Sequence, residues 1–334
     1  MNKKPDISVI VPAFNSAKTI RRCMRAVLAS KQSNLELIVV DDRSSDKTTT
    51  ILKSFSKDPR VKLIFHKQNR GTPTTCNDGA RIARGNYIVI LGSDVLVEKN
   101  CISKLVEPME QDLSIGMTQG TLISAFSHDT ESIGHFLTIF GFPYELYSQR
   151  YKSLKKPMRI FGARAVTACR TELYKKIGGY DEDYIFHGED TDFSWRVSLA
   201  GYQIYTIPLA HAYHYHFKSE KLAIAHYLYY EGPKNQISNI IKNTSLPILV
   251  PMLFLNLIIW LGLSIKCLVT KRPAYARGIY GGIYWNIRNI HITLQKRSKI
   301  RSYRSGNNDT EKIMFGPIGL RQYIRKGLAW LRYV

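Results

Sequence analysis

The chain has 334 residues, which is long enough for one large domain or two of moderate size. A hydrophobic content of 44% and only 13 prolines argue against a disordered protein. The five cysteines are scattered without the spacing of a disulfide framework or a metal site, so we interpret them as reduced packing residues. The first six residues have no apolar segment behind their charges, and from this we expect no secretion signal.

The net charge of +22 is concentrated towards the C-terminal end. Residues 266–334 contain 15 Lys and Arg against 2 Asp and Glu, and they adjoin a hydrophobic run. A basic segment beside an apolar one indicates an anionic membrane surface as partner. Nucleic acid is the alternative partner, and it would bind with a steep salt dependence. Because no zinc, helix-turn-helix or RNA-binding signature accompanies the charge, we expect no nucleic-acid partner.

Short apolar runs alternate with helical patterns through the first third of the chain. The runs predicted to be strands are 7–12, 35–40, 61–65 and 87–91. Helical patterns begin near Ser16, after Asp46, and over residues 74–83. Strands that alternate with helices in this way predict an α/β fold with a doubly wound, mostly parallel sheet.

Polar side chains stand where three of the predicted strands end. Asn15, Asp42 and Asp94 each fall just past a strand. Ligands of doubly wound sheets bind beyond the carboxyl ends of the strands. We therefore expect these three side chains to converge on one rim of the sheet.

Two further strands are predicted over 115–124 and 204–215. The second contains His211 and His214, and His216 follows it directly. Residues 136–156 between them are rich in aromatic and basic side chains. These side chains could contact an acceptor or lipid, and a core role is the alternative for most of the rings.

Residues 246–269 are the main candidate for a membrane span, since a helix needs about 20 apolar residues to cross a bilayer. Residues 275–294 are a weaker second candidate. The stretch 320–332 is amphipathic and predicts either an interfacial helix or packing onto the globular domain. A single span would separate the basic tail from the N-terminal domain across the membrane. A hairpin, or one span with interfacial helices, therefore fits better.

Several groups of residues, in serial order, resemble the motifs of family 2 glycosyltransferases. They are residues 11–15, 39–46, 69–71 with 77–79, and 178–190, within a resemblance that covers roughly residues 6–240. The resemblance implies a GT-A fold, a nucleotide-sugar donor and an inverting reaction by one in-line displacement. The C-terminal part is similar to small archaeal or bacterial lipid-linked sugar transferases, and more narrowly to a minimal cellulose-synthase-like mannosyltransferase. We accordingly expect a GT-A catalytic domain over 1–240 and membrane-associated helices with a basic amphipathic tail over 241–334.

By this resemblance the rim would bind the nucleotide. The residues expected to do so are Pro12, Ala13, Phe14, Asn15, Asp41, Asp42, Arg70, Asn77 and Ser93. The carboxylate of Asp42 would accept a hydrogen bond from a ring N–H of the nucleobase. Helix capping and loop hydrogen bonding are the alternative roles of Asp41 and Asp42, and a turn role is the alternative for Asn77.

The diphosphate site departs from the family pattern. The family has an Asp-X-Asp motif after the fourth strand, and here Gly92 replaces the first Asp. Asp94 remains to bind a divalent cation, Mn²⁺ or Mg²⁺, with His214 or His216 as the second protein ligand by resemblance. Such a cation would stabilise the departing diphosphate. Packing at the end of the strand is the alternative role of the histidines.

The Glu189–Asp190 pair stands at a predicted helix start. By resemblance, Asp190 would be the general base that takes the proton of the acceptor hydroxyl, and capping of the helix is its alternative role. Glu189 and Lys234 would contact the acceptor or the diphosphate, and a solvated place at the membrane edge is the alternative for Lys234. An acceptor that is already an ionised lipid phosphate would need Asp190 for orientation only.

Together these features predict an inverting, membrane-attached hexosyltransferase. Its donor would be a nucleotide sugar, with GDP-mannose favoured and a UDP-hexose as the other candidate. Its acceptor would be lipid-linked, of the polyprenyl or dolichyl phosphate type, at the cytoplasmic face of the cell membrane. The Gln-X-X-Arg-Trp motif of processive enzymes is absent, which argues against a polysaccharide synthase. The alternative, motivated by Gly92, is a catalytically weak nucleotide-sugar-binding or scaffold protein of the same fold.

Overall fold

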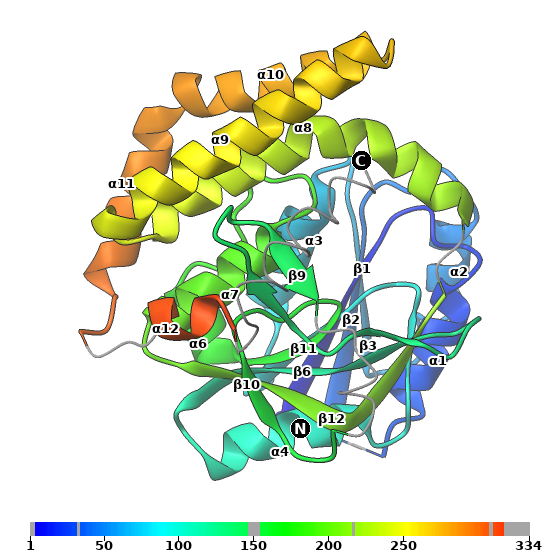
Figure 1. The fold of residues 1–334 in the computed structure, drawn as a ribbon. Coiled ribbons are helices and arrows are strands. Elements are labelled where there is room, and N and C mark those ends of the chain that lie inside the picture. The colour runs from blue at the N-terminus through cyan, green and yellow to red at the C-terminus, as the bar shows by residue number, and fades with distance from the viewer. Residues whose placement is uncertain (1–3, 32–33, 146–153, 216–217, 307–309, 317–334) are drawn as a thin grey trace.

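The computed structural model describes residues 4–31, 34–145, 154–215, 218–306 and 310–316 (Figure 1). Its centre is a ten-stranded sheet. Eight strands follow one another in the spatial order β10 (Met158–Ile160), β12 (Gln203–His214), β6 (Ile115–Ser124), β11 (Val166–Arg170), β4 (Tyr87–Leu91), β1 (Ile7–Ala13), β2 (Leu35–Asp41) and β3 (Val61–Phe65). The short strand β5 (Val95–Val97) pairs with β12, and β7 (Thr130–Ser132) pairs with β6.

The sheet is mixed and mostly parallel. Strands β4, β1, β2 and β3 run parallel, as do β6 and β12, whereas β11 lies antiparallel between β4 and β6. The six strands predicted from the sequence are confirmed, each with bounds within one residue of those expected. A separate two-stranded ribbon, β8 (His135–Leu137) with β9 (Pro143–Glu145), lies within the aromatic region that carried no strand prediction.

Helices cover both faces of the sheet (Figure 1). One face carries α1 (Ile20–Leu28), α2 (Thr48–Lys53) and α4 (Cys101–Gln111), and the other carries α3 (Gly71–Ile82), α6 (Thr171–Lys176) and α7 (Glu189–Leu199). Val9 and Val11 of β1 belong to the core on the first face, and Ile10 belongs to the core on the second. Because both faces are buried, β1 and β2 are nearly continuous apolar runs in the sequence.

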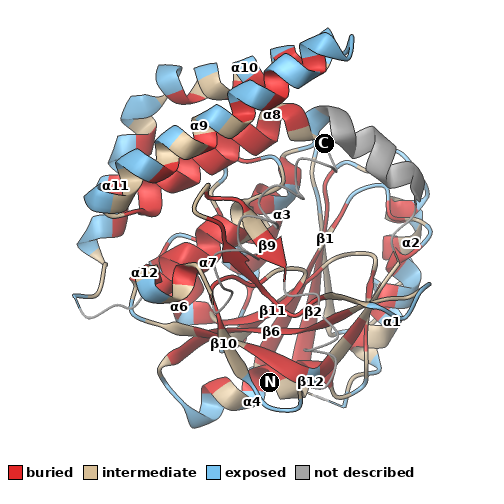
Figure 2. Ribbon diagram, viewed as in Figure 1, coloured by how far each residue is buried: buried red, intermediate tan, exposed pale blue. Residues whose placement is uncertain are grey.

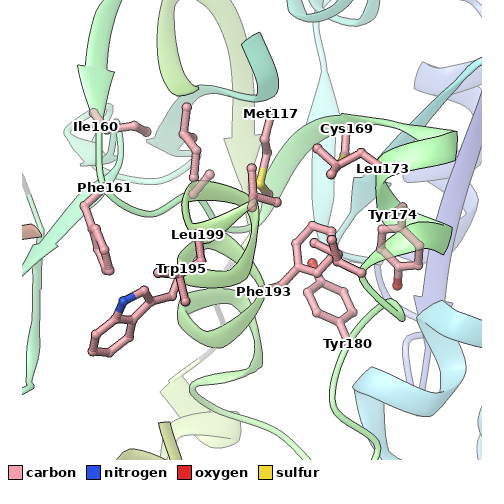
Figure 3. Close-up of a cluster of buried hydrophobic side chains, with 14 of the residues drawn as sticks. Met117, Ile160, Phe161, Cys169, Leu173, Tyr174, Tyr180, Phe193, Trp195 and Leu199 are labelled. Carbon is pink, nitrogen blue, oxygen red and sulfur yellow. The ribbon is translucent and has the colours of Figure 1, made fainter. Parts of the chain in front are cut away.

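Aromatic packing holds α7 against the second face (Figure 3). The ring of Phe193 lies 4.9 Å from that of Tyr174 and 5.2 Å from that of Tyr180, measured between centroids. The ring of Trp195 lies 5.5 Å from that of Phe161, edge to face. Tilted and edge-to-face contacts of this kind stabilise a packing beyond the area they bury. They fix the position of the helix on which the Glu189–Asp190 pair stands.

Further helices follow β12 along the chain. They are α8 (Lys218–Asn243), α9 (Leu246–Val269), α10 (Pro273–Arg288), α11 (Ile290–Ser302) and α12 (Thr310–Met314). Helix α8 packs against α7 and is covered in turn by α9, α10 and α11, and Figure 1 shows these helices across one end of the molecule. Phe142, Trp260 and Ile279 belong to a small core between them. The expected domain boundary at residue 240 falls inside α8.

Within the described ranges, α9 is the one helix long and apolar enough to cross a membrane. The weaker candidate over 275–294 is divided between α10 and α11. Figure 2 shows exposed residues on the outer sides of α9 and α10, whereas the part of α8 with described side chains is largely buried. His216 and the amphipathic stretch 320–332 lie outside the described residues.

Substitution of Ile38 in β2 tests whether the sheet is buried on both of its faces. Its side chain is fully buried, so Ile38→Ala should lower the free energy of unfolding by about 2–5 kcal/mol through lost burial and a cavity. Urea denaturation followed by fluorescence measures the change. Leu113 is 76% exposed, and Leu113→Ala should stay within about 0.5 kcal/mol of the wild type. Equal effects of the two substitutions would contradict the assigned core.

Candidate active site

The rim of the sheet begins at the end of β1. Pro12 and Ala13 are the last residues of the strand, and the ring of Phe14 that follows is 51% exposed. The backbone N–H of Asp42 donates to the carbonyl of Ala13 at 2.8 Å, so the chain leaving β2 stays beside the chain leaving β1. An exposed aromatic ring at this edge offers a flat apolar face to a ligand.

Hydrogen bonds tie the loop after β1 to its two neighbours. Asn15 adopts a left-handed backbone with φ +49°, and its side-chain oxygen accepts the backbone N–H of Ser45 at 2.8 Å. The hydroxyl of Ser16 lies 2.7 Å from that of Ser93, which follows β4. The structure therefore brings Asn15 and Ser93 to the same rim, as the sequence predicts for the loops after β1 and β4.

Asp42 caps the start of α3. Its Oδ1 accepts the backbone N–H of Arg70 and its Oδ2 accepts that of Gly71, both at 2.8 Å, and Nδ1 of His66 lies 2.8 Å from Oδ1. The capping role that the sequence left as an alternative is thus present. The guanidinium of Arg70 donates to Asp78 at 2.7 Å, and with a side chain 38% exposed it stays at the edge of the rim.

One of the two carboxylate oxygens of Asp41 can still accept a hydrogen bond from a ligand. Its Oδ2 accepts the N–H of Ser44 at 3.3 Å and the hydroxyl of Thr49 at 3.2 Å. Its Oδ1 is buried and has no hydrogen-bond partner among the described residues. A buried acceptor without a donor is costly, so a ligand with an N–H or O–H group fits this position.

Asn77 points away from the rim. Its Nδ2 donates to the carbonyl of Tyr180 at 2.9 Å, and its Oδ1 accepts the backbone N–H of Tyr180 at 2.9 Å and the hydroxyl of Tyr174 at 2.7 Å. Both ends of the amide hold the turn that contains Tyr180. The contacts of Asn77 therefore correspond to the turn role, and the structure does not bring it together with Asn15 and Asp42.

Asp94 and His214 meet because β5 pairs with β12, with His214 opposite Val95. Oδ2 of Asp94 lies 3.2 Å from Nε2 of His214, and Nδ1 of His214 lies 2.6 Å from Oε2 of Glu131. Burial lowers the pKa of His214, but hydrogen bonds to the two carboxylates outweigh it, and the net direction is upward. The carboxylate of Glu131 orients the imidazole in the way that carboxylates orient metal-binding histidines.

This pair fits a divalent cation that takes its remaining ligands from a diphosphate and water. A carboxylate oxygen and an imidazole nitrogen suit Mn²⁺ or Mg²⁺, and no group of three or more possible ligands occurs in the described ranges. A Cβ on Gly92 would lie 2.7 Å from Oδ1 of Asp94, so the glycine leaves room for the present position of that carboxylate. His211 lies elsewhere, with Nδ1 3.5 Å from Glu98.

Side chains of α8 hold residues 183–188, which we call the catalytic loop because they lead to Asp190, the candidate base. Lys234 donates to the carbonyl of Asp183 at 2.9 Å, Asn235 donates to those of Phe186 and His187 at 3.0 and 2.7 Å, and Asn239 donates to that of Gly188 at 3.0 Å. The N–H of Ile185 donates back to Glu231 at 3.2 Å. These donors and acceptors recur along one face of α8, at the three- and four-residue spacing of a helix.

Lys234 is a positioning residue in this arrangement. It is 3% exposed, and its Nζ pairs with Glu231 at 2.7 Å as well as with the catalytic loop. It is not among the residues that line the cavity beside Asp190. Its contacts differ from the solvated position that the sequence left open.

The catalytic loop ends in two left-handed residues, His187 with φ +69° and Gly188 with φ +91°. Such a backbone is strained for a residue other than glycine and is common at functional sites. It turns the chain into α7, whose first turn holds Glu189, Asp190 and Asp192. Helix N-termini favour carboxylates, so capping and a chemical role are compatible here.

A cavity of about 70 Å³, which we call the Asp190 cavity, opens beside this turn. Its lining includes His135, Arg164, Glu189, Asp190, Trp195 and Gln236. Burial and, secondarily, the charge of Asp190 raise the pKa of Glu189 to about 8. Glu189 therefore keeps its proton at neutral pH and adds no second negative charge beside Asp190. Burial also lowers the pKa of His135, which favours its neutral form.

Asp190 itself is held by its neighbour. Its Oδ1 accepts the backbone N–H of Thr191 at 2.7 Å, and the hydroxyl of Thr191 lies 3.1 Å from Nε2 of His135. Oε2 of Glu189 and Nε1 of Trp195 are buried without a hydrogen-bond partner among the described residues. The cavity thus offers a fixed carboxylate together with unused polar groups.

A backbone contact links the segment before the Asp94–His214 pair to the lining of the Asp190 cavity. The N–H of Gly92 donates to the carbonyl of Ala165 at 3.3 Å, and the preceding residue, Arg164, lines the cavity. The guanidinium of Arg164 pairs with Glu145 at 3.0 Å. A donor bound at Asp94 would therefore lie next to the segment that faces Asp190.

Four residues that sequence reasoning missed belong to this site: Glu131, Arg164, Gln236 and Asn239. Each is a lone polar residue with no motif around it. Glu131 and Arg164 reach the site through strand pairing and loop geometry distant in sequence. The spacing of Glu231, Asn235 and Asn239 on one helical face was the one signal that could have indicated the role of α8.

Comparisons with known proteins agree with this fold and these motifs. The profile of "Glycosyl transferase family 2" matches residues 8–178. Poly-beta-1,6-N-acetyl-D-glucosamine synthase of Staphylococcus aureus (strain COL) is 27% identical over 223 residues, which cover 63% of this chain and 52% of the relative. The chain thus spans about half the length of the curated relatives it matches.

Two solved structures share the fold over most of their length. S. aureus TarS 1–349 in complex with UDP-GlcNAc has a TM-score of 0.57 at 18% identity, with coverage of 89% of this chain and 90% of that one. Mannosyltransferase PcManGT from Pyrobaculum calidifontis, in complex with GDP-Man and Mn²⁺, has a TM-score of 0.53 at 16% identity, with coverage of 90% and 86%. The expected GT-A fold is confirmed, and the chain belongs to glycosyl transferase family 2.

The raised pKa of Glu189 predicts a pH-dependent stability. A carboxyl that holds its proton more tightly when folded loses its contribution as the pH rises from its unfolded value of 4.5 to about 8. Glu189→Gln removes this loss, so at about pH 9 the variant should exceed the wild type by up to about 5 kcal/mol in free energy of unfolding. The difference should shrink towards pH 5. Urea denaturation at each pH measures it.

Glu172 of α6 provides the matched control, because it is exposed. Glu172→Gln should shift stability by less than about 0.5 kcal/mol, with no comparable rise towards alkaline pH. A flat difference between Glu189→Gln and wild type across this range would contradict a proton held on Glu189.

Proposed function

We propose that this chain is an inverting glycosyltransferase that transfers a hexose from a nucleotide sugar to a lipid-linked acceptor. The observation that carries the proposal is the backbone hydrogen bond from Gly92 to Ala165, which links the segment that leads to Asp94 with the segment that lines the Asp190 cavity at Arg164. A donor diphosphate on one side and an acceptor on the other would bring the two reacting groups together. Membership of glycosyl transferase family 2 supports the same reaction class.

On the donor side, Asp94 and His214 would hold a divalent cation, Mn²⁺ or Mg²⁺, that stabilises the departing diphosphate. The Mn²⁺ in the PcManGT complex supports this assignment. The rim residues Phe14, Asn15 and Asp41 would bind the nucleobase. GDP-mannose is the first donor to test, and UDP-GlcNAc is the second because TarS was solved with it.

On the acceptor side, Asp190 would take the acceptor proton as the acceptor oxygen attacks the anomeric carbon and the bond to the diphosphate breaks. Thr191 holds Oδ1 of Asp190, which leaves Oδ2 to take the proton. Protonated Glu189 avoids a second negative charge that would repel the leaving diphosphate or a phosphate on the acceptor. For an acceptor that is already ionised, the same contacts orient it.

The lipid-linked character of the acceptor is supported by the wall of the Asp190 cavity. Gln236 lines the cavity, and its Oε1 accepts from the amide of Asn256 on the apolar helix α9 at 3.2 Å. One helix therefore separates the cavity from an exposed apolar surface. We propose that residues 1–240 carry the chemistry and residues 241–334 attach the protein to the cytoplasmic face of the cell membrane.

The second candidate function is a nucleotide-sugar-binding or scaffold protein with little turnover. It is favoured by Gly92, which removes one carboxylate from the metal motif of the family. Wild-type protein that binds donor nucleotides but hydrolyses or transfers no donor in the presence of membrane extracts would establish this function. Turnover of any donor would exclude it.

Asp190→Asn tests the acceptor side. The amide cannot take a proton, so kcat should fall by a factor of about 100 to 10 000 while donor binding stays unchanged. Transfer of radiolabelled sugar to membrane extracts gives the rate, and thermal shift with nucleotide gives the binding. Full activity in this variant would contradict the role of Asp190.

Asp94→Asn tests the donor side. Loss of the carboxylate should abolish the Mn²⁺-dependent part of the thermal shift produced by GDP or UDP, because ligand binding stabilises the folded state in proportion to its affinity. His211→Asn is the matched control, since His211 lies on the same strand as His214 but beside Glu98. A Mn²⁺-dependent shift that survives in Asp94→Asn would refute the proposed metal site.

A further inference from the structure

Helix α9 exposes one continuous apolar face. Seven of its exposed apolar residues recur every three or four positions, and each of the seven is between 44% and 70% exposed. They are Leu246, Val250, Phe254, Ile258, Leu261, Ile265 and Leu268. At a rise of 1.5 Å per residue the row is about 33 Å long. Soluble monomers rarely leave an apolar patch of this extent uncovered.

The neighbouring helices widen this face. Tyr280, Tyr284 and Ile287 of α10 are 44% to 67% exposed, and Ile290 and Leu294 of α11 are 40% and 50% exposed. Figure 2 shows the exposed sides of α9 and α10 at the outer end of the molecule. Tyrosine is favoured at the boundary between lipid and water because its ring is apolar and its hydroxyl is polar.

The opposite face of α9 is bound to the rest of the protein. The amide of Asn256 donates to the carbonyl of Phe140 at 2.7 Å and to Gln236 at 3.2 Å. Trp260 is 2% exposed, and its ring lies 5.6 Å from that of Phe142. A bilayer-spanning α9 would either break these contacts or draw Gln236 and the Asp190 cavity into hydrocarbon, where unpaired polar groups are costly.

The basic residues around the apolar face indicate what kind of surface covers it. Residues 246–306 contain ten Lys and Arg and neither Asp nor Glu. Lys271, Arg272, Arg277 and Arg288 are exposed along the edges of α9 and α10. Anionic lipid headgroups attract such cations, whereas a second copy of this chain would bring like charges together. An anionic bilayer therefore fits both the apolar row and its basic border.

We propose that α9 lies along the surface of an anionic bilayer, with its apolar face in the headgroup–acyl boundary, and does not cross it. Helices of this kind bury one face in the interface while the other stays in water or protein. The inference rests on the proposed membrane attachment and adds its geometry. Both ends of α9 then lie on the same side of the membrane as the catalytic site, and the Asp190 cavity lies about one helix diameter, some 10 Å, from the lipid.

Cysteine labelling tests the orientation in the full chain. The native cysteines are all buried, so introduced cysteines give the signal. Pro247→Cys places an exposed thiol at the start of α9, Ala274→Cys places one at the start of α10, just past the end of α9, and Ser56→Cys marks the catalytic domain. A membrane-impermeant maleimide should label all three cysteines in vesicles of one orientation, inverted or right-side-out, and none of them in vesicles of the other orientation. Reaction of Pro247→Cys and Ala274→Cys from opposite sides would overturn the inference and leave membrane attachment standing.

Flotation with lipid vesicles tests the surface itself. Purified protein should float with phosphatidylglycerol vesicles more strongly than with phosphatidylcholine vesicles. The double variant Phe254→Glu with Ile258→Glu should bind about tenfold more weakly or worse, because it places charges on the apolar face. Leu113→Glu, at a site outside α9 that is more exposed than either of these residues, should bind as the wild type does.

Outcomes against the inference are distinguishable. Unchanged flotation of the double variant would show that the apolar face is not the contact. A stable dimer with no flotation in either lipid would assign the face to a second copy and overturn membrane attachment as well. Nucleotide-induced thermal shifts do not depend on lipid, so they report separately on the donor site.

Discussion

The catalytic loop depends on donors supplied by α8. Residues 183–188 lie outside any strand or helix, and their carbonyl groups need partners wherever water is excluded. Lys234, Asn235 and Asn239 provide those partners at 2.7 to 3.0 Å. Because the loop leads directly into Asp190 through a left-handed turn, the placement of α8 determines the placement of the carboxylate.

Buried charges reinforce the same contact between α7 and α8. Asp192 of α7 is fully buried and accepts from Arg196 at 2.8 Å and from Lys242 of α8 at 2.9 Å. Lys242 also pairs with Asp181, which precedes the catalytic loop. The charges of Arg196 and Lys242 hold the pKa of Asp192 low against the opposing effect of burial. An arrangement of paired buried charges tolerates little displacement, since each charge would lose its partner.

The sheet and its rim were predictable from local patterns, whereas much of the site was not. Strands such as β1 and β2 are apolar runs because both faces are buried, and the polar residues after them fall on the rim by topology alone. The pairing of β5 with β12 brings Asp94 to His214 and could be expected only from the family resemblance. The roles of Asn77 and Lys234 were ambiguous in the sequence, because the position of a residue in a helix does not reveal which neighbouring segment its side chain contacts. Arg164 and Glu131 reach the site through contacts between segments distant in sequence.

The continuity of α8 across residue 240 has a practical consequence for dissecting this protein. A fragment that ends at residue 240 would lack Lys242 and Lys296, and with them both lysine partners of Asp181 and the lysine partner of Asp192. Removal of one partner from a buried ion pair costs about 3–5 kcal/mol, a large share of the stability of a typical domain. Helix α8 beyond residue 240 therefore supports the segment that leads to Asp190, and a truncation at residue 240 would disturb the candidate site.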